Sequence, residues 1–424
     1  MAAALTVAVV SGAWLLGGRP AAPTAAPAPT ATVAEPTPVP SSPSPTATPA
    51  RAPSRTPAAG PPKGTFGVDQ AYLSQYRARR VDWDDVLASG RRLPRPDAAC
   101  KASWKKSGKD TRLAWKHGHF WCLADLAGGH WKPQGITGSG STGGYRIRGH
   151  AASSRNLVLI SWYSRAAEKG LFAPNRAGQS VTRLMVVDLN RKRYASVELV
   201  RPQGADRLRN LNSHGSGLAW AGQYLYSSSR SWLWRYNADD LLRINGHFVL
   251  PAVARWSVSG SGGLSSISVD RSTGRDQLVG VNYSKTAPAY VHTFDLGHRG
   301  LLVGHARAAG PSLQLTTGFG EKHRVVGSLA STAVPGTHYQ GVARWGRLTL
   351  ANSSSARVTT GGHRSNALVV LGSGRIRKQF RLPRGNVESI YLDRRRKSYL
   401  SLTEAGSRFL FTMPLRDVIR AARR

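Results

Sequence analysis

Two adjacent stretches decide the fold: Leu264–Asp270 (LSSISVD) and Gln277–Tyr283 (QLVGVNY), joined through a turn at Arg271–Gly274. Both alternate aliphatic with small or polar residues, the period-two pattern of a β-strand with one buried face. The residues between them are mostly Ser, Thr, Gly and Asp, which favour a turn. The pair therefore predicts two antiparallel strands.

The phrase that opens the first stretch recurs along the chain. It consists of a small or polar residue, then Gly or Ser, then an aliphatic run. The copies are Gln134–Thr137, Gly217–Trp220, Ser265–Asp270, Gln340–Trp345 and Glu388–Leu392. Repeated four-stranded sheets of this kind build a β-propeller. The sequence predicts an all-β fold, a single β-propeller of five or six four-stranded blades with a short N-terminal helical clasp.

Four blades can be traced strand by strand, at Trp131–Val200, Gly217–Leu250, Leu264–Gly304 and Gly341–Leu382. We expect a short helical insertion at Ala238–Leu242 in blade two, and Leu301–Gly304 as the fourth strand of blade three. Blade five, Ser389–Thr412, contains three strands. A segment near Trp121 would supply the fourth and close the ring, which removes exposed sheet edges. The interval Ser312–Val334 has room for a sixth blade.

The N-terminal part of the sequence indicates where the protein is located and not how it folds. Residues 1–19 contain the apolar run Leu5–Gly17, shorter than the roughly 20 residues of a membrane span, and predict a signal peptide or signal anchor. Residues 20–65 are almost wholly Pro, Ala, Thr and Ser and predict a disordered linker. Residues 66–94 predict the helical clasp, and 95–424 the propeller. We expect a secreted or extracellular protein, or one anchored through its first segment.

The only two cysteines, Cys100 and Cys122, lie just before the first repeat. In an exported chain they predict a disulfide. A metal site that combines them with His117 and His119 is the alternative, but the spacing is not that of a zinc motif. We therefore expect neither a metal nor a cofactor.

The formal net charge of +37 is spread along the chain, and no nucleic-acid-reading motif accompanies it. A diffuse basic surface favours polyanions. For an exported monomer, an anionic cell-wall polymer or a membrane surface is the expected partner, and a specific nucleic acid is not. The alternative is that the charge serves solubility alone.

Three segments resemble a family of exported actinobacterial β-propeller proteins of uncharacterised function. They are Trp131–Thr137 (WKPQGIT), His214–Leu218 (HGSGL) and Tyr339–Val342 (YQGV). The resemblance would cover residues 95–417. The same phrases are more loosely similar to blades of NHL, YVTN and SMP-30 type, some of which are lactonases and many of which only bind. The resemblance implies a propeller fold and export, and no particular chemistry.

Polar residues at the start of each innermost strand would meet at one mouth of the ring. The candidate ligand-binding residues are Gln134, His214, Ser265 or Ser266, Gln340 and Glu388, with Asn212 and His338 nearby. Buried polar groups need partners, so these side chains converge on a ligand or bond one another as structural pins.

Two functions fit this pattern. The first is a binding or scaffold module at the cell surface for an anionic, carbohydrate or other small-molecule ligand. The second is a hydrolase or lactonase with His214 as base and Glu388 as acid. Glycosidase and metal-lactonase sites need several acidic residues, whereas Glu388 is the only acidic side chain among these openings. The aspartates Asp188, Asp270 and Asp295 follow strands and predict turns.

Overall fold

The computed structural model describes residues 75–107, 119–123, 130–147, 149–164, 171–172, 180–203, 207–260, 263–285, 288–297, 300–303, 313–319, 325–357, 364–406 and 408–423. The predicted signal segment, the linker, the part of the predicted clasp before residue 75, and His117 lie outside these residues. Within the described part, no helix has the length and apolar character that crossing a bilayer requires.

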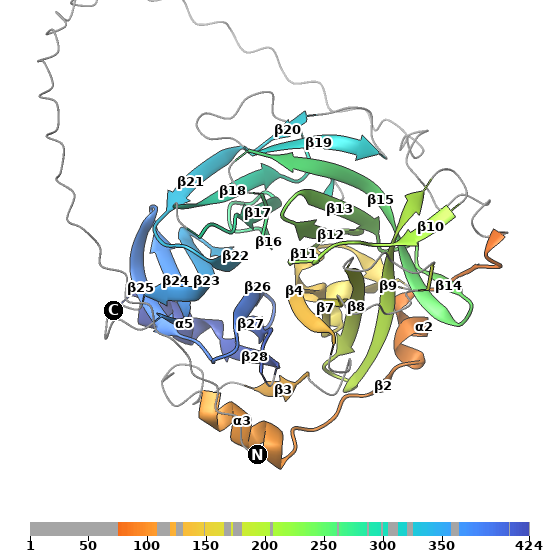
Figure 1. Cartoon of the computed structure of the whole chain (residues 1–424), viewed down its shortest axis with the longest axis horizontal. Helices are drawn as coiled ribbons and strands as arrows, with labels where there is room; N and C mark the ends of the chain where they lie inside the picture. Colours follow the sequence, from red (N-terminus) through yellow and green to blue (C-terminus); the bar gives the residue numbers. More distant parts are fainter. Residues whose placement is uncertain are drawn as a thin grey trace, which may run out of the picture. The chain divides into compact units, whose positions relative to one another are not determined.

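The described strands form five blades around one axis (Figure 1). Blade one consists of β4 (Lys132–Gly138), β7 (Leu157–Ser164), β8 (Val181–Asp188) and β9 (Arg193–Gln203). Blade two consists of β11 (Gly217–Ala221), β12 (Tyr224–Ser229), β13 (Trp232–Asn237) and β15 (His247–Ser259). Blade three consists of β16 (Ser266–Asp270), β17 (Gln277–Val281), β18 (Ala289–Asp295) and β21 (Ala330–Val334).

Blade four consists of β22 (Tyr339–Trp345), β23 (Leu348–Arg357), β24 (Arg364–Gly372) and β25 (Arg375–Arg381). Blade five consists of β26 (Val387–Asp393), β27 (Ser398–Thr403), β28 (Phe409–Pro414) and β3 (Phe120–Cys122). Strand β3 pairs antiparallel with β28, so Trp121 lies opposite Leu410. The predicted closure of the ring by the N-terminal segment is therefore confirmed, and so is the all-β propeller.

The fourth strand expected for blade three at Leu301–Gly304 was wrong, and Ser312–Val334 does not form a sixth blade. Leu302 forms only an isolated bridge with Leu296, and the fourth strand of blade three is β21. The interval expected to hold a sixth blade contributes β19 (Gln314–Phe319) and β20 (Val325–Gly327), which extend blade two beyond β15, and then β21. The spacing of strand-like segments indicates how many strands there are but not which strands pair, so it left open whether this interval extends a blade or forms a new one.

The helical insertion predicted at Ala238–Leu242 was also wrong. Asn237 accepts a hydrogen bond from the Asp239 amide at 3.2 Å, which closes a turn instead of starting a helix. The chain then enters β14 (Leu242–Ile244), which pairs with the first part of β15 and with β1 (Arg79–Arg80). The first part of β15 also pairs parallel with β9, so blades one and two share one continuous outer rim.

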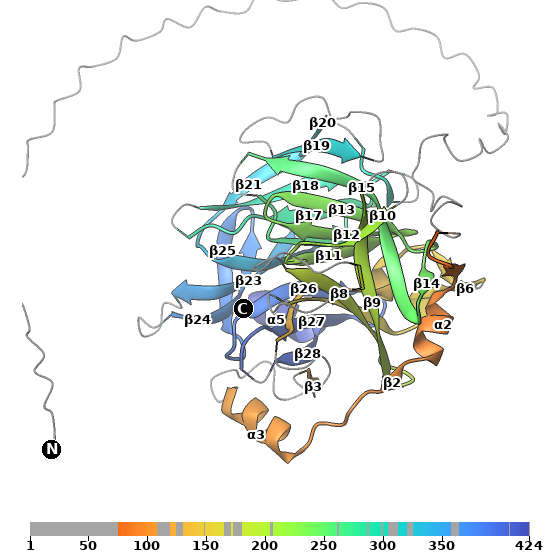
Figure 2. The same ribbon diagram turned by 45° about the vertical axis from the view of Figure 1, so that its right-hand side comes forward.

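A short helix, α2 (Trp83–Ala88), covers the outer side of blades one and two, as Figures 1 and 2 show. Trp83, Val86 and Leu87 are buried, and the Trp83 indole donates a hydrogen bond to the Ala238 carbonyl at 3.1 Å. Asp82 caps the helix by accepting from the amides of Asp84 and Asp85.

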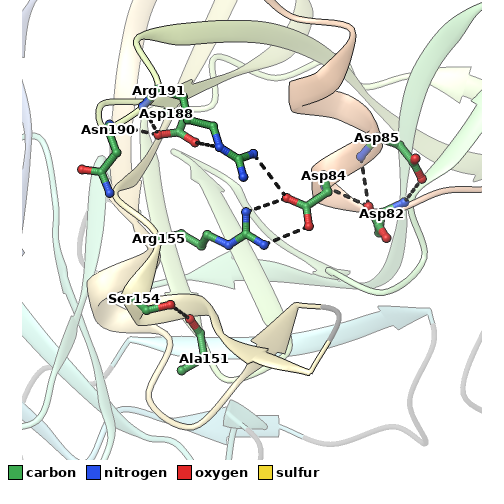
Figure 3. Close-up of polar contacts among 9 residues, drawn as sticks. All are labelled: Asp82, Asp84, Asp85, Ala151, Ser154, Arg155, Asp188, Asn190 and Arg191. Carbon is green, nitrogen blue, oxygen red and sulfur yellow. Dashed lines mark hydrogen bonds and ion pairs between the residues drawn. The ribbon is translucent and has the colours of Figure 1, made fainter.

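Charged side chains attach the same helix to blade one. Asp84 on α2 accepts two hydrogen bonds from Arg155, at 2.7 and 2.9 Å, and faces Arg191 at 3.8 Å (Figure 3). Asp188, at the end of β8, accepts hydrogen bonds from the amides of Asn190 and Arg191 and so forms the turn that its position predicted. A paired, bidentate arrangement of this kind fixes orientation as well as adding energy.

The predicted disulfide between Cys100 and Cys122 is present. Cys100 lies on α3 (Ala98–Ser107) and Cys122 on β3, so the bridge connects a helix to the strand that closes the ring. Trp104 of α3 stacks on Phe120 with ring centroids 4.5 Å apart. At the other end of the chain, α5 (Leu415–Arg423) buries Leu415 and Val418 against blades four and five.

The five innermost strands contact one another in the order β4, β11, β16, β22, β26 and back to β4. Each carries Gly or Ser at the second position of the repeated phrase, where the neighbouring backbone comes closest. A Cβ atom on Gly217 would lie 2.4 Å from the Ile267 nitrogen, and one on Gly341 would lie 2.7 Å from the Glu388 carbonyl oxygen. The small residue is therefore a condition for closing a ring of five.

We predict that Gly217→Ala lowers the free energy of unfolding by at least about 1–3 kcal/mol, because the added methyl group overpacks the axis. The matched control is Gly144→Ala, whose Cβ would meet no atom within 4 Å. It should change stability by less than about 0.5 kcal/mol. Urea unfolding midpoints measure both. Equal stability of the two variants would show that the axis accommodates a larger residue.

Candidate functional site

The predicted site residues lie at one end of the ring, where the innermost strands begin. We call this the axial end. Gln134, Gln340 and Glu388 lie near the starts of β4, β22 and β26, Ser266 starts β16, and His214 precedes β11. The second strand of each blade ends here too, because it runs antiparallel to the first. The axial end therefore combines residues from strand starts and strand ends.

Ser266 belongs to the axis and not to an accessible site. It is fully buried, and its hydroxyl lies 3.1 Å from the hydroxyl of Ser389. Ser389 in turn donates to the Ser216 carbonyl at 2.8 Å, so three innermost strands are connected. Ser265 donates to the Tyr339 carbonyl at 3.0 Å. These serines are the structural pins that were the alternative to ligand binding.

Gln134 is also buried, and its side-chain amide donates to the carbonyl of Pro133 at 3.0 Å. The second glutamine, Gln340, is only partly buried. Its side chain forms a hydrogen bond with the carboxyl group of Glu388. Gln340 and Glu388 are thus brought together, one from β22 and one from β26.

Glu388 is a carboxyl group buried at the axial end, an environment that is unusual for an acidic side chain. Its side chain is 1% exposed, and its Oε1 has no hydrogen-bond partner. Burial raises the pKa of Glu388 well above its usual range, the nearby charge of Glu404 raises it further, and Gln340 and Lys132 oppose the shift. Glu388 is therefore a neutral carboxylic acid over a pH range in which an exposed glutamate is ionised.

A second carboxyl group, Glu404, follows β27 at the same end. It accepts a hydrogen bond from the Tyr163 hydroxyl at 3.0 Å and forms an ion pair with Lys132 at 3.8 Å. The ring of Tyr163 packs against His214, with centroids 4.3 Å apart. His214 is connected in this way, through Tyr163, to Glu404, a carboxyl group that was not among the residues expected from the sequence.

Blade three contributes a further aromatic pair. Tyr283 follows β17, and its ring meets His338 edge-to-face at 5.3 Å. Burial raises the pKa of Tyr283, with the carboxyl group of Glu388 as a second and smaller cause. Tyr283 and His338 are partly exposed, whereas Asn212, which was expected nearby, is exposed and accepts a hydrogen bond from the Ser180 amide.

The axial end is thus built in two layers. The lower layer is buried and holds Gln134, Tyr163 and Glu388. The upper layer is partly exposed and holds His214, Tyr283, His338, Gln340 and the half-exposed Lys132. Glu404 connects the two layers through Tyr163 and Lys132. The upper layer is the one that solvent reaches, so a ligand meets it first.

The repeated phrase does not indicate four residues of the axial end, namely Lys132, Tyr163, Glu404 and Tyr283. The last three lie at or just after the end of a second strand, whereas the phrase marks only the starts of first strands. The ends of the second strands are the signal in the sequence that points to them, because antiparallel strands bring a start and an end to the same edge.

Among the described residues, no group of three or more His, Cys, Asp or Glu side chains is arranged to hold a metal ion. The disulfide removes both thiols from the alternative Cys/His site. Asp270 accepts from the Ser272 amide and so forms a turn, as expected.

Comparisons with known proteins add little to this geometry. No family model and no curated protein sequence matches the chain. Among solved structures, the Swd1 β-propeller domain of Myceliophteria thermophila is 10% identical with a TM-score of 0.31, over 66% of this chain and 83% of that one. A gluconolactonase from Xanthomonas campestris is 11% identical with a TM-score of 0.34, over 77% and 96%. With similarity this low, the five-bladed propeller rests on the strand pairing.

We predict that Glu388 makes folding stability depend on pH. Its folded-state pKa is raised, so the folded protein holds a proton that the unfolded chain releases above its ordinary pKa of about 4.3. Stability should therefore fall as pH rises from that value toward the folded pKa. Glu388→Gln, which cannot ionise, should lose less stability than the wild type between pH 5 and pH 8 in urea titrations.

The control for this measurement is Asp417→Asn, which removes a partly exposed carboxyl group that pairs with the exposed Arg416 on α5. This variant should keep the pH dependence of the wild type. A wild-type slope that persists unchanged in Glu388→Gln would contradict the prediction.

Proposed function

We propose that this chain is a binding propeller whose axial end recognises a neutral, hydroxyl-rich ligand such as a carbohydrate. The observation that carries the proposal is the composition of the upper layer. His214, Tyr283, His338 and Gln340 each can donate and accept hydrogen bonds, as a hydroxyl group does. Aromatic faces next to such groups suit the mixed polar and apolar surface of a sugar.

Charge supports a neutral ligand at this end. The chain as a whole carries a formal net charge of +37, yet the axial end contains two carboxyl groups. Glu404 is paired with Lys132, and Glu388 is held neutral by burial. An anionic ligand would therefore find little net attraction here. The buried lower layer fixes Gln340 and His214 through Glu388 and Tyr163, which lowers the entropy lost on binding.

The wider setting is part of the same proposal. A signal segment and a Pro-rich linker would place the domain outside the cell, secreted or anchored, and carry it away from the membrane. A disulfide between α3 and β3 suits an oxidising environment. The propeller would then act as a monomeric surface module that holds a wall or environmental glycan.

We predict that the full chain is retarded in gels that contain neutral polysaccharides such as dextran, mannan or arabinogalactan. Gln340→Ala should weaken the interaction with the retarding polymer at least about tenfold, because one polar contact to the ligand is lost. Calorimetry with that polymer measures the affinity. The matched control is Gln314→Ala, an exposed glutamine on β19, which should bind like the wild type. If none of the polymers retards the protein, or if both variants bind equally, the proposal fails.

A hydrolase is the second candidate, because the two carboxyl groups have contrasting surroundings. Glu388 is buried and neutral and could donate a proton, while Glu404 accepts from Tyr163 and faces Lys132, as a carboxylate does. Such pairs divide acid and base roles in glycosidases. This pair replaces the His214 and Glu388 pair expected from sequence.

If the chain is a hydrolase, the wild type should release reducing ends from the polysaccharide that retards it in the gel. Glu388→Gln and Glu404→Gln should each lower that rate at least about a hundredfold while binding persists. No release above the buffer blank by the wild type would leave only the binding function.

A further inference from the structure

Two arginines face each other on the outer rim of blade one. Strand β10 (Arg207–Asn210) pairs antiparallel with the end of β9, and Arg209 lies directly opposite Arg201. Figures 1 and 2 place this hairpin beside β15. Like charges directly opposite each other destabilise a strand pair. The arrangement therefore opposes folding unless something else offsets the repulsion.

The hairpin is held firmly by its other face. Leu208 and Asn210 are buried, and Leu208 packs with Val200 and Phe172. The Leu208 amide donates to the Tyr76 hydroxyl at 2.9 Å, and Asn210 donates to the Phe172 carbonyl at 2.7 Å. Because the buried face fixes the register, the outward face must present its arginines together. Arg207, two residues before Arg209, lies on the same outward face.

A third arginine joins them from the neighbouring strand. Arg255 on β15 lies over the ring of Trp232, 4.3 Å from its centroid, and 5.5 Å from that of Trp234. Burial lowers the pKa of Arg201, and Arg209 lowers it further. Burial likewise lowers the pKa of Arg255, with Arg201 as the second cause. Arg201 therefore feels the positive charge of Arg209 and in turn acts on Arg255.

Other arginines of this rim have acidic partners. Arg183 on β8 lies 2.6 Å from Glu198 on β9, and Arg155 pairs with Asp84. Among the described residues, no carboxylate lies within ion-pair distance of Arg201 or Arg209. We propose that Arg201 and Arg209, with Arg255 beside them, form a binding site for the phosphate groups of a soluble polyanion.

Phosphate matches these side chains because the planar guanidinium group donates two parallel hydrogen bonds to it. A polymer fits better than a single ion, since Arg207 continues the row at the two-residue spacing of a strand, about 7 Å. A membrane fits less well. Surface docking needs exposed apolar side chains next to the charges, and the exposed large ones described, Val303, Val325, Leu329 and Ile376, lie on neither β9 nor β10.

The test uses the full chain and long-chain inorganic polyphosphate, with affinity measured by calorimetry at fixed ionic strength. The double variant Arg201→Gln/Arg209→Gln should bind at least about tenfold more weakly than the wild type. The control is Arg375→Gln/Arg377→Gln on the exposed outer strand β25, which removes the same charge. The affinity of this control for polyphosphate should stay within about threefold of the wild-type value, because only the non-specific attraction between the basic protein and the polyanion is reduced.

Thermal unfolding is a second readout, and it distinguishes arginines that bind a ligand from arginines that stabilise the fold. Without polyphosphate, the Arg201→Gln/Arg209→Gln variant should unfold at the same temperature as the wild type or a higher one, because repulsion is relieved. A lower midpoint would mean that the arginines serve the fold. If that variant does not fold, Arg209→Gln alone is measured in the same way.

Three outcomes would overturn the proposal. The first is equal loss of polyphosphate binding in the two double variants. The second is inorganic phosphate binding as tightly as polyphosphate, which would make this a single-ion site. The third is sedimentation with phosphatidylglycerol vesicles that requires Arg201 and Arg209 while polyphosphate binding does not, which would assign the site to a lipid headgroup. These measurements do not involve the axial end, so their outcome is independent of the outcome of the carbohydrate test.

Discussion

The close approach of five innermost strands around one axis is the constraint on which the rest of the structure depends. Each strand meets its neighbour at a Gly or Ser, and the backbone of the next strand occupies the space that a larger side chain would need. Where the residue is Ser, its hydroxyl connects innermost strands that are not neighbours in the ring: Ser389 of β26 bonds to Ser266 of β16 and to Ser216 just before β11. The Gly or Ser recurs in the repeated phrase because the innermost strands can pack this closely only at a small residue.

That requirement also creates the candidate site. The residue before each Gly or Ser is carried to the same end of the ring, and the end of each second strand arrives beside it. Buried carboxyl groups at this end are costly, so each needs a neutralising feature. Glu404 has Lys132 and Tyr163, and Glu388 holds its proton. Two carboxyl groups with different surroundings make the axial end chemically versatile while leaving it nearly neutral.

The basic charge is organised differently. Near α2, arginines are matched with aspartates and attach the helix to blade one (Figure 3). On the hairpin of β9 and β10, arginines face arginines. The net charge of the chain does not distinguish these two situations. The arginines near α2 are neutralised by aspartates within the fold, whereas the arginines of the β9–β10 hairpin face the solvent. The molecule therefore separates a nearly neutral axial end from a cationic rim.

Sequence by itself determined the propeller, the disulfide and the closing strand near Trp121, because alternation, a repeated small residue and cysteine count are local or periodic signals. It placed Gln340 and Glu388 correctly at strand starts. Only the tertiary structure decided that β19 and β20 extend blade two, that Ser266 is a pin, and that Glu404 and Tyr163 join the axial end. Those facts depend on which strands pair across the ring, and on burial by residues distant in sequence, neither of which a linear pattern records. The opposition of Arg201 and Arg209 has the same origin, since one residue of register would have turned Arg209 to the other face.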